Sequence, residues 1–290
     1  MKTNKIDRRK FVKQTAAVTG GLMAVPFAAS AGFYTEKAPA PIRVALVGCG
    51  GRGTGAAVQA LNAHPDVKLV AMADAFRDRL DNSLKNIKEE VDNAQSRVEV
   101  PESRKFTGFE AYKKAIQEAD VVILTTPPGF RPIHFKEAVK QGKHIFMEKP
   151  VATDPAGILS VLETAKEARN KKLNVIVGLQ RRYQNSYLEL LKRYQDGMIG
   201  DITSAQVYWN SRGVWVRERQ PSQNEMEYQM RNWYYFNWLC GDHIVEQHIH
   251  NMDVVNWFKQ DYPTIAQGMG GRTVRVGPNF GEIFDHHFVE

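Results

Sequence analysis

Short apolar runs alternate with longer amphipathic stretches between residues 42 and 177. The runs have the length of strands and lie at residues 42–47, 67–73, 121–124, 144–147 and 173–177. The amphipathic stretches between them have helical length and lie at residues 54–63, 76–90, 109–118, 133–140 and 155–170. Continuous apolar strands separated by helices are typical of a parallel sheet that is covered on both faces. The pattern therefore predicts an α/β fold with a doubly wound, Rossmann-type parallel sheet.

Beyond Gly178 the segments become more polar. Helices are expected at residues 186–195 and 243–258, and strands at residues 202–209, near Ile265 and at residues 282–289. Residues 211–231 are rich in charged and aromatic side chains and predict a long loop that could cover a site. Together these segments predict an α+β domain with an open, mostly antiparallel sheet. An unpaired apolar edge would remain where the sequence stops, so we expect the chain to be truncated at its C-terminus.

The first 31 residues differ from the rest in charge. Six basic residues against one acidic residue give this segment +5 of the net charge of +7, so the remaining residues hold only +2. This is too little for a polyanion-binding surface, and we expect no nucleic-acid partner. Arg8-Arg9-Lys10-Phe11 resembles a twin-arginine export signal, and Ala29-Ser30-Ala31 has the form of a cleavage site. The apolar run between them is too short and weak for a stable membrane span.

Four segments are therefore expected along the chain. They are a twin-arginine signal peptide at 1–31, a linker at 32–41, a Rossmann domain at 42–165 and an incomplete second domain at 166–290. A disordered basic tail is the alternative for the first segment. The export signal implies a location in the periplasm or cell envelope. Only two cysteines, Cys49 and Cys240, are present, which excludes a disulfide framework and a four-cysteine zinc site.

A glycine-rich turn follows the first apolar run. Gly48-Cys49-Gly50-Gly51-Arg52-Gly53 matches the G-x-G-x-x-G pattern of dinucleotide-binding folds. In that pattern the first glycine permits a tight turn, the second lets a pyrophosphate approach the backbone, and the third lets the helix pack closely on the sheet. The free N–H groups at the start of the helix favour phosphate. The cofactor-binding residues expected here are Gly48, Gly50, Gly51, Arg52 and Gly53.

The choice between NAD and NADP depends on Asp74, which comes 21 residues after Gly53 at the end of the second apolar run. A carboxylate at this position can accept hydrogen bonds from both adenosine ribose hydroxyls. Because a 2′-phosphate would meet a like charge, we expect NAD rather than NADP. Arg77 lies close enough in sequence to oppose this preference.

Glu148-Lys149-Pro150 directly follows the fourth apolar run. The carboxyl edge of an open α/β sheet is where ligands bind, so Lys149 could contact a substrate hydroxyl beside a nicotinamide ring. The alternative is a solvated lysine that precedes a helix.

Several separate motifs resemble those of the Gfo/Idh/MocA oxidoreductases, from about Ile42 to the end of the chain. They are the glycine turn, Thr125-Thr126-Pro127-Pro128, Gly142-Lys143-His144, Glu148-Lys149-Pro150 and Gly178-Leu179-Gln180-Arg181-Arg182. The resemblance implies that Lys149 is catalytic and binds the carbinol oxygen. It also adds Thr125, Pro127, Glu148 and Lys149 to the expected cofactor-binding residues.

The family carries an Asp-x-x-x-His arrangement on a helix of its second domain, with the histidine as general base. The matching segment reads Glu246-Gln247-His248-Ile249-His250, so the resemblance assigns this role to His250 and places Glu246 where the family has aspartate. On an α-helix, Glu246, His250 and Asp253 would share one face, and a carboxylate could fix the imidazole tautomer. The extra methylene of Glu246 would displace its carboxylate. Arg181 and Asp253 are the candidate substrate-binding residues.

Two further clusters have competing interpretations. A zinc site is an alternative for His243, Glu246, His248 and His250, but the spacing matches no familiar ligand set, and we expect no metal. Five aromatic residues could either stack on sugar rings or pack in the core. They are Trp233, Tyr234, Tyr235, Trp238 and Trp257.

Three functions remain open at this point. The resemblance implies an NAD-dependent dehydrogenase that acts on a hydroxyl group of a sugar, glycoside or cyclitol. A second possibility is a glycosidase that oxidises C3 transiently and has no net redox change, as in some family members. A third is a non-catalytic protein that binds a sugar or nucleotide, against which the presence of both Lys149 and His250 argues. The expected partners are a small carbohydrate and, through the sheet of the second domain, a second copy of the chain.

Overall fold

The computed structural model describes residues 40–290. The predicted signal peptide and residues 32–39 of the predicted linker lie outside the described residues. In the described part of the chain, each helix is too short or too polar to cross a membrane.

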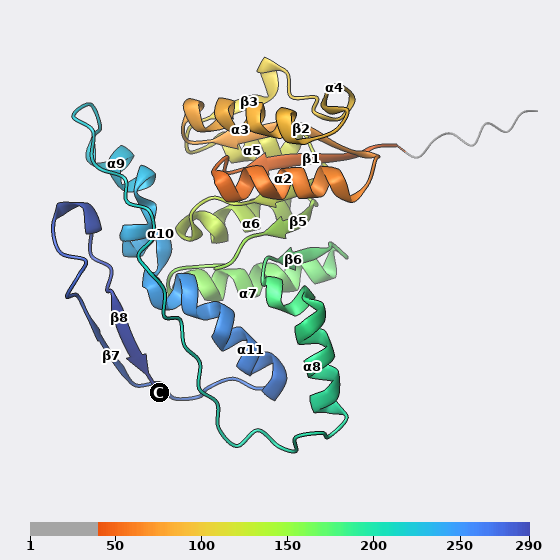
Figure 1. Ribbon diagram of the computed structural model, residues 1–290. Coiled ribbons are helices and arrows are strands. Elements are labelled where there is room, and N and C mark those ends of the chain that lie inside the picture. The colour runs from red at the N-terminus through yellow and green to blue at the C-terminus, as the bar shows by residue number, and fades with distance from the viewer. Residues whose placement is uncertain (1–39) are drawn as a thin grey trace, which may run out of the picture. The chain divides into compact units, whose positions relative to one another are not determined.

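Six parallel strands form the main sheet, in the order β3-β2-β1-β4-β5-β6 (Figure 1). They are β1 (Ile42–Val47), β2 (Val67–Asp74), β3 (Lys105–Thr107), β4 (Val121–Leu124), β5 (His144–Met147) and β6 (Val175–Val177). The chain order reverses between β1 and β4, which creates a crevice at the carboxyl ends of these two strands. The predicted doubly wound parallel sheet is thus confirmed. The sequence did not predict β3, because its three residues form no apolar run.

Helices cover both faces of this sheet. One face packs against α2 (Gly51–Ala63) and α3 (Arg77–Glu90), and the other against α5 (Ala111–Gln117), α6 (Arg131–Lys140) and α7 (Pro155–Asn170). Side chains of β1 alternate between the two cores: Val44 and Leu46 pack on the first, and Ala45 and Val47 on the second. This double burial explains why the strands are continuously apolar. The short helix α4 (Ala94–Arg97) precedes β3.

The second half contains four α-helices and an antiparallel pair of strands. The helices are α8 (Asn185–Gln195), α9 (Glu225–Arg231), α10 (Asn237–Cys240) and α11 (Ile249–Lys259). The strands β7 (Gly268–Gly271) and β8 (His286–Val289) form the smaller sheet. Tyr228 of α9 and the aromatic residues between α9 and α10 form one cluster with Phe76 and Phe130 of the first half. Four of the five aromatic side chains noted in the sequence belong to packed aromatic clusters rather than to an exposed surface: Trp233, Tyr234, Tyr235 and Trp257.

Two predictions for the second half are wrong, and a third, the helix at 243–258, is confirmed with a π-helical start. Residues 202–209 form no strand; side chains satisfy carbonyls of this stretch, since Lys259 donates to Ile202 and Asn251 donates to Tyr208. The predicted loop at 211–231 contains α9, which Asn224 caps by accepting the backbone N–H of Glu227 at 2.8 Å. The predicted helix at 243–258 begins as a π-helix, Ile244–His248, before α11.

Candidate active site

The glycine turn joins β1 to α2 by close backbone packing. Gly48 has a φ of 98°, and a Cβ there would lie 2.5 Å from the backbone N of Thr126. A Cβ on Gly53 would overlap the carbonyl oxygen of Gly48 and the hydroxyl of Thr125. That hydroxyl donates to the Gly48 carbonyl at 2.6 Å, so Thr125 holds the turn itself. In contrast, a Cβ on Gly50 would meet no atom within 4 Å, which leaves the start of α2 open to a phosphate.

Asp74 lies beside this turn at the end of β2. Its carboxylate accepts the backbone N–H of Cys49 at 2.7 Å and that of Phe76 at 2.9 Å. Burial raises the pKa of Asp74, while these two hydrogen bonds oppose the increase. The carboxylate is therefore fixed in position with lone pairs left for a ribose. These residues fit the adenosine half of a dinucleotide.

The arginine near Asp74 that faces the turn is Arg79, not Arg77. Arg77 pairs with Asp81 at 2.7 Å and with Glu102 at 2.5 Å, on the outer surface of α3. Arg79 instead lines a polar cavity of about 270 Å³ together with Gly50 and Gly51. Sequence spacing could not distinguish the two arginines, because only the rotation of α3 decides which one faces the turn.

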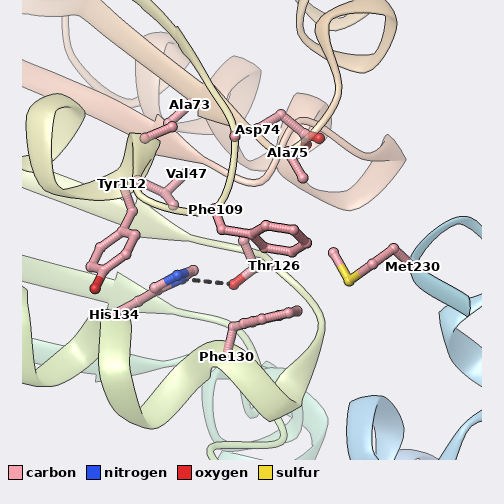
Figure 2. A pocket seen from close by; sticks show the side chains of 12 residues that line it. Val47, Ala73, Asp74, Ala75, Phe109, Tyr112, Thr126, Phe130, His134 and Met230 are labelled. Atoms are coloured by element: carbon pink, nitrogen blue, oxygen red, sulfur yellow. Dashed lines mark hydrogen bonds between the residues drawn. The ribbon is translucent and has the colours of Figure 1, made fainter. Parts of the chain in front are cut away.

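A small apolar cavity of about 30 Å³ adjoins Asp74 on the other side (Figure 2). Phe109 and Phe130 face each other across it, and Met230 reaches it from α9 (Figure 2). Met230 also could not be found by sequence reasoning, since it lies 156 positions from Asp74 along the chain.

At the carboxyl end of β5, Lys149 meets Glu246 from the second half. The Lys149 Nζ donates to the Glu246 carbonyl at 2.5 Å and to its Oε1 at 3.1 Å. Both side chains are about one-tenth exposed, at 11% and 10%. Burial raises the pKa of Glu246, and the positive charge of Lys149 opposes this effect. Its other oxygen, Oε2, is buried without a hydrogen-bond partner among residues 40–290.

His250 lies next to this pair at the start of α11. Its ring stacks on Trp209, with 5.6 Å between the ring centroids. Burial, together with the positive charges of Lys149 and Arg181, lowers the pKa of His250 to about 4. The imidazole is therefore neutral near pH 7 and can accept a proton.

The other predicted site residues form pairs within the chain. Asp253 accepts from Arg182 at 2.8 Å, and Arg181 bonds the side chain of Asn251 and the His250 carbonyl. Glu148 accepts from Arg52 at 2.6 Å, which links the end of β5 to the start of α2. Pro127 begins the turn after β4. The geometry thus brings Lys149, Glu246 and His250 together. Asp253 is separate from this group, because its carboxylate forms an ion pair with Arg182.

A wider cavity of about 500 Å³ opens beside His250 and shares Trp209 as a wall. His243, His248 and Arg275 also line it. Within the described part of the chain, no three His, Cys, Asp or Glu side chains are arranged to hold a metal ion. The imidazole rings of the lining histidines give this cavity hydrogen-bonding groups on one side.

Among known protein families, one resembles the first half of the chain. The model of the Gfo/Idh/MocA oxidoreductase family, described as an NAD-binding Rossmann fold, matches residues 42–178. Residues 42–178 are therefore similar to this family. The matched region contains the glycine turn, Asp74 and Lys149, and extends through β6.

Curated relatives match at lower identity. A glycosyl hydrolase family 109 protein of Streptomyces coelicolor is 26% identical over 63% of this chain and 35% of its own length. Inositol 2-dehydrogenase of Gluconacetobacter diazotrophicus is 38% identical over 29% of this chain and 25% of its own. The chain thus spans well under two thirds of these relatives.

Solved structures support the fold. Scyllo-inositol dehydrogenase from Lactobacillus casei, with bound NAD(H) and scyllo-inositol, aligns with a TM-score of 0.57 and 22% identity. The alignment covers 80% of this chain and 60% of that one. The likeness shows a shared arrangement of strands and helices.

Proposed function

We propose that this protein is an NAD-dependent oxidoreductase that acts on a hydroxyl group of a sugar, glycoside or cyclitol. The observation that supports this most directly is the meeting of Lys149 with Glu246 and His250 at the same sheet edge as the glycine turn. A basic residue that can accept a proton and an ammonium that can hold an oxygen lie together there, next to a dinucleotide-binding turn.

Each residue of this group has a distinct task. Bound NAD would supply the acceptor for hydride from the carbon that bears the hydroxyl group. Lys149 directs two of its three protons to Glu246, which orients the third toward a substrate oxygen. His250 takes the hydroxyl proton on a ring nitrogen that is already unprotonated near pH 7. Glu246 is a positioning residue, because it acts on the substrate through Lys149.

The reaction is tested by incubating the purified protein with a panel of inositols, free sugars and aryl glycosides. Cofactor absorbance, ketone product and released aglycone are followed together. Formation of NADH with a ketone supports the dehydrogenase. Absence of both redox change and aglycone release across the panel, with NAD bound, would contradict the proposal.

A redox-neutral glycosidase is the second candidate, because the family 109 relative aligns with 63% of this chain. The same Lys149 and His250 would serve a transient oxidation followed by reduction of the ketone. In the panel above, this reaction releases aglycone without net formation of NADH. The two candidates therefore differ in net NADH formation and in aglycone release.

We further propose that the protein is exported by the twin-arginine route to the periplasm or cell envelope. The motif at Arg8 and Arg9 and the small residues at 29–31 support this proposal. Fractionation of cells that express the full chain tests it. Export that survives conversion of both arginines to lysine would contradict it.

A further inference from the structure

Residues 217–231, called the strap below, cross from the second half to the start of α3. Arg231 donates from both terminal nitrogens to Asp78, each at 3.0 Å, in a bidentate pair. Its guanidinium also lies 4.0 Å from the centre of the Phe76 ring. Phe76 follows Asp74 by two residues and donates to its carboxylate. The strap is therefore fastened to the loop that carries the expected ribose ligand.

The base of the strap is closed by a buried asparagine. Asn232 is fully buried, and its Oδ1 accepts the backbone N–H of Arg217 at 2.9 Å. Its Nδ2 donates to the carbonyl of Asn279 at 2.9 Å. Asn224 caps α9 within the strap. The strap is thus a closed loop with a fixed base, rather than a free tail lying on the surface.

The inner side of the strap faces both cavities beside Asp74. Met230 is buried and reaches the apolar cavity opposite Phe109 and Phe130 (Figure 2). Arg217 lines the polar cavity of about 270 Å³, together with Gly50, Gly51 and Arg79. One segment of the second half therefore covers the glycine turn and the neighbourhood of Asp74 at the same time.

The polar cavity has the charge that a phosphate requires. Within residues 40–290, neither Arg79 nor Arg217 forms an ion pair. The nearby carboxylate, Asp78, is occupied by Arg231, and that pairing lowers the pKa of Asp78. Two guanidinium groups without a carboxylate partner, one of them resting on the ring of Trp215, thus lie beside the open start of α2, where free N–H groups also favour an anion.

We propose that the strap retains the bound dinucleotide, with Arg231 fastening it to Asp78, Met230 facing the adenosine half, and Arg217 with Arg79 holding a dinucleotide phosphate. This inference rests on the proposed NAD binding, but not on the proposed hydride transfer. Release of the cofactor then requires the strap to leave α3, so the Arg231–Asp78 pair controls the rate of release. Met230 can adjust its shape to admit the adenosine, because methionine side chains are flexible.

The first test measures the release of NADH from the loaded full-length protein after mixing with excess NAD, followed by nicotinamide fluorescence. Arg231→Met and Asp78→Asn should each speed release about tenfold, because a bidentate charge-assisted pair is lost. The double exchange, Asp78→Arg with Arg231→Asp, should restore slow release. Arg43→Met is the matched control: Arg43 also forms a two-bonded pair with an aspartate, Asp120, but at the start of β1. It should leave release unchanged.

The second test measures dissociation constants of NAD and NADP by calorimetry. Arg217→Gln should weaken binding about tenfold. An equal loss for both cofactors identifies the pyrophosphate as the bound group, and a loss confined to NADP identifies its 2′-phosphate. Unchanged affinity of Arg217→Gln for both NAD and NADP, or an unchanged rate of NADH release from Arg231→Met, would overturn the proposed role of the strap. A wild-type protein that binds neither cofactor would instead overturn the proposed function on which the strap depends.

Discussion

At the scale of single residues, the position of the Lys149 ammonium is set by its ion pair with the buried carboxylate of Glu246. The Glu246 carboxylate has Lys149 as its charged partner and one oxygen that is unpaired among the described residues. The resulting geometry restricts the lysine ammonium to a narrow range of directions. A substrate oxygen that approaches this ammonium would also approach His250.

Replacing Lys149 with Met should lower kcat by at least about 10²-fold, because the developing charge on the substrate oxygen loses its donor. Binding of NAD should be retained, since the glycine turn and Asp74 are untouched. Steady-state kinetics and calorimetry check the two parts separately. Near-normal turnover would remove Lys149 from the mechanism.

The acid limb of the pH profile should report His250. Its pKa is lowered to about 4, so the neutral form that accepts a proton is present above that pH and is lost as the pH falls through about 4. An unperturbed histidine would lose activity already near pH 6.5, at about its ordinary pKa. Measurement of kcat/KM against pH in the free enzyme checks this prediction. An acid limb near 6.5 would show that His250 is more hydrated or is not the base.

Asp74 should favour NAD over NADP. Its carboxylate is fixed by two backbone N–H groups and cannot turn away from a 2′-phosphate. Asp74→Ser should weaken NAD and relatively favour NADP, with Arg79 available to the added phosphate. Calorimetric titration of both cofactors checks this, and a wild-type preference for NADP would contradict it.

At the scale of elements, the glycine turn positions α2 against β1 and β4. Gly53→Val should weaken both folding and dinucleotide binding, because its side chain meets the Gly48 backbone and α2 has to move. The loss of stability should be roughly 1–3 kcal/mol, as for other overpacked sites. Gly213→Val is the control, since a Cβ there would meet no atom within 4 Å and Gly213 lies outside the glycine turn. Denaturant unfolding and NAD titration of both variants give the comparison, and equal behaviour would contradict the packing argument.

The π-helix at Ile244–His248 affects how the proposed catalytic residues are arranged. A π turn contains about one residue more than an α turn, so the side chains along it do not follow the i, i+4 rule. Glu246 contacts Lys149, whereas Asp253 further along pairs with Arg182. The sequence predicts that Glu246 and Asp253 share one helix face, but in the structure their carboxylates pair with different residues, Lys149 and Arg182.

At the scale of the whole molecule, the strap and the glycine turn lie more than 160 positions apart in the sequence and line the same polar cavity. A ligand that binds only the folded state adds to stability in proportion to the logarithm of its concentration over its dissociation constant. We therefore expect NAD to remain bound through purification and to raise the Tm. Acid denaturation followed by chromatography should release about one dinucleotide per chain. An empty protein that exchanges added NAD rapidly would contradict this prediction.

Local patterning determined much of the first half. Doubly buried strands must be continuously apolar, and a tight turn that meets backbone must be glycine, so β1, the turn and Asp74 could all be located from the sequence. Lys149 was located because it directly follows a recognisable strand. In the second half, α8 was predicted almost to the residue, since its helical pattern is regular.

Tertiary structure alone decided the rest. Polar and apolar residues alternate at 202–209, but such a segment forms a strand only where a neighbouring strand pairs with it. Here the side chains of Asn251 and Lys259 donate hydrogen bonds to its carbonyl groups instead. Which arginine faces the turn depends on the rotation of α3, and Met230 and Arg231 meet residues at least 100 positions away in the sequence. A sequence pattern shows which residues of a helix or strand are buried, because the spacing of buried positions depends on the geometry of that element. It does not show which distant element buries them, because that depends on how the elements pack.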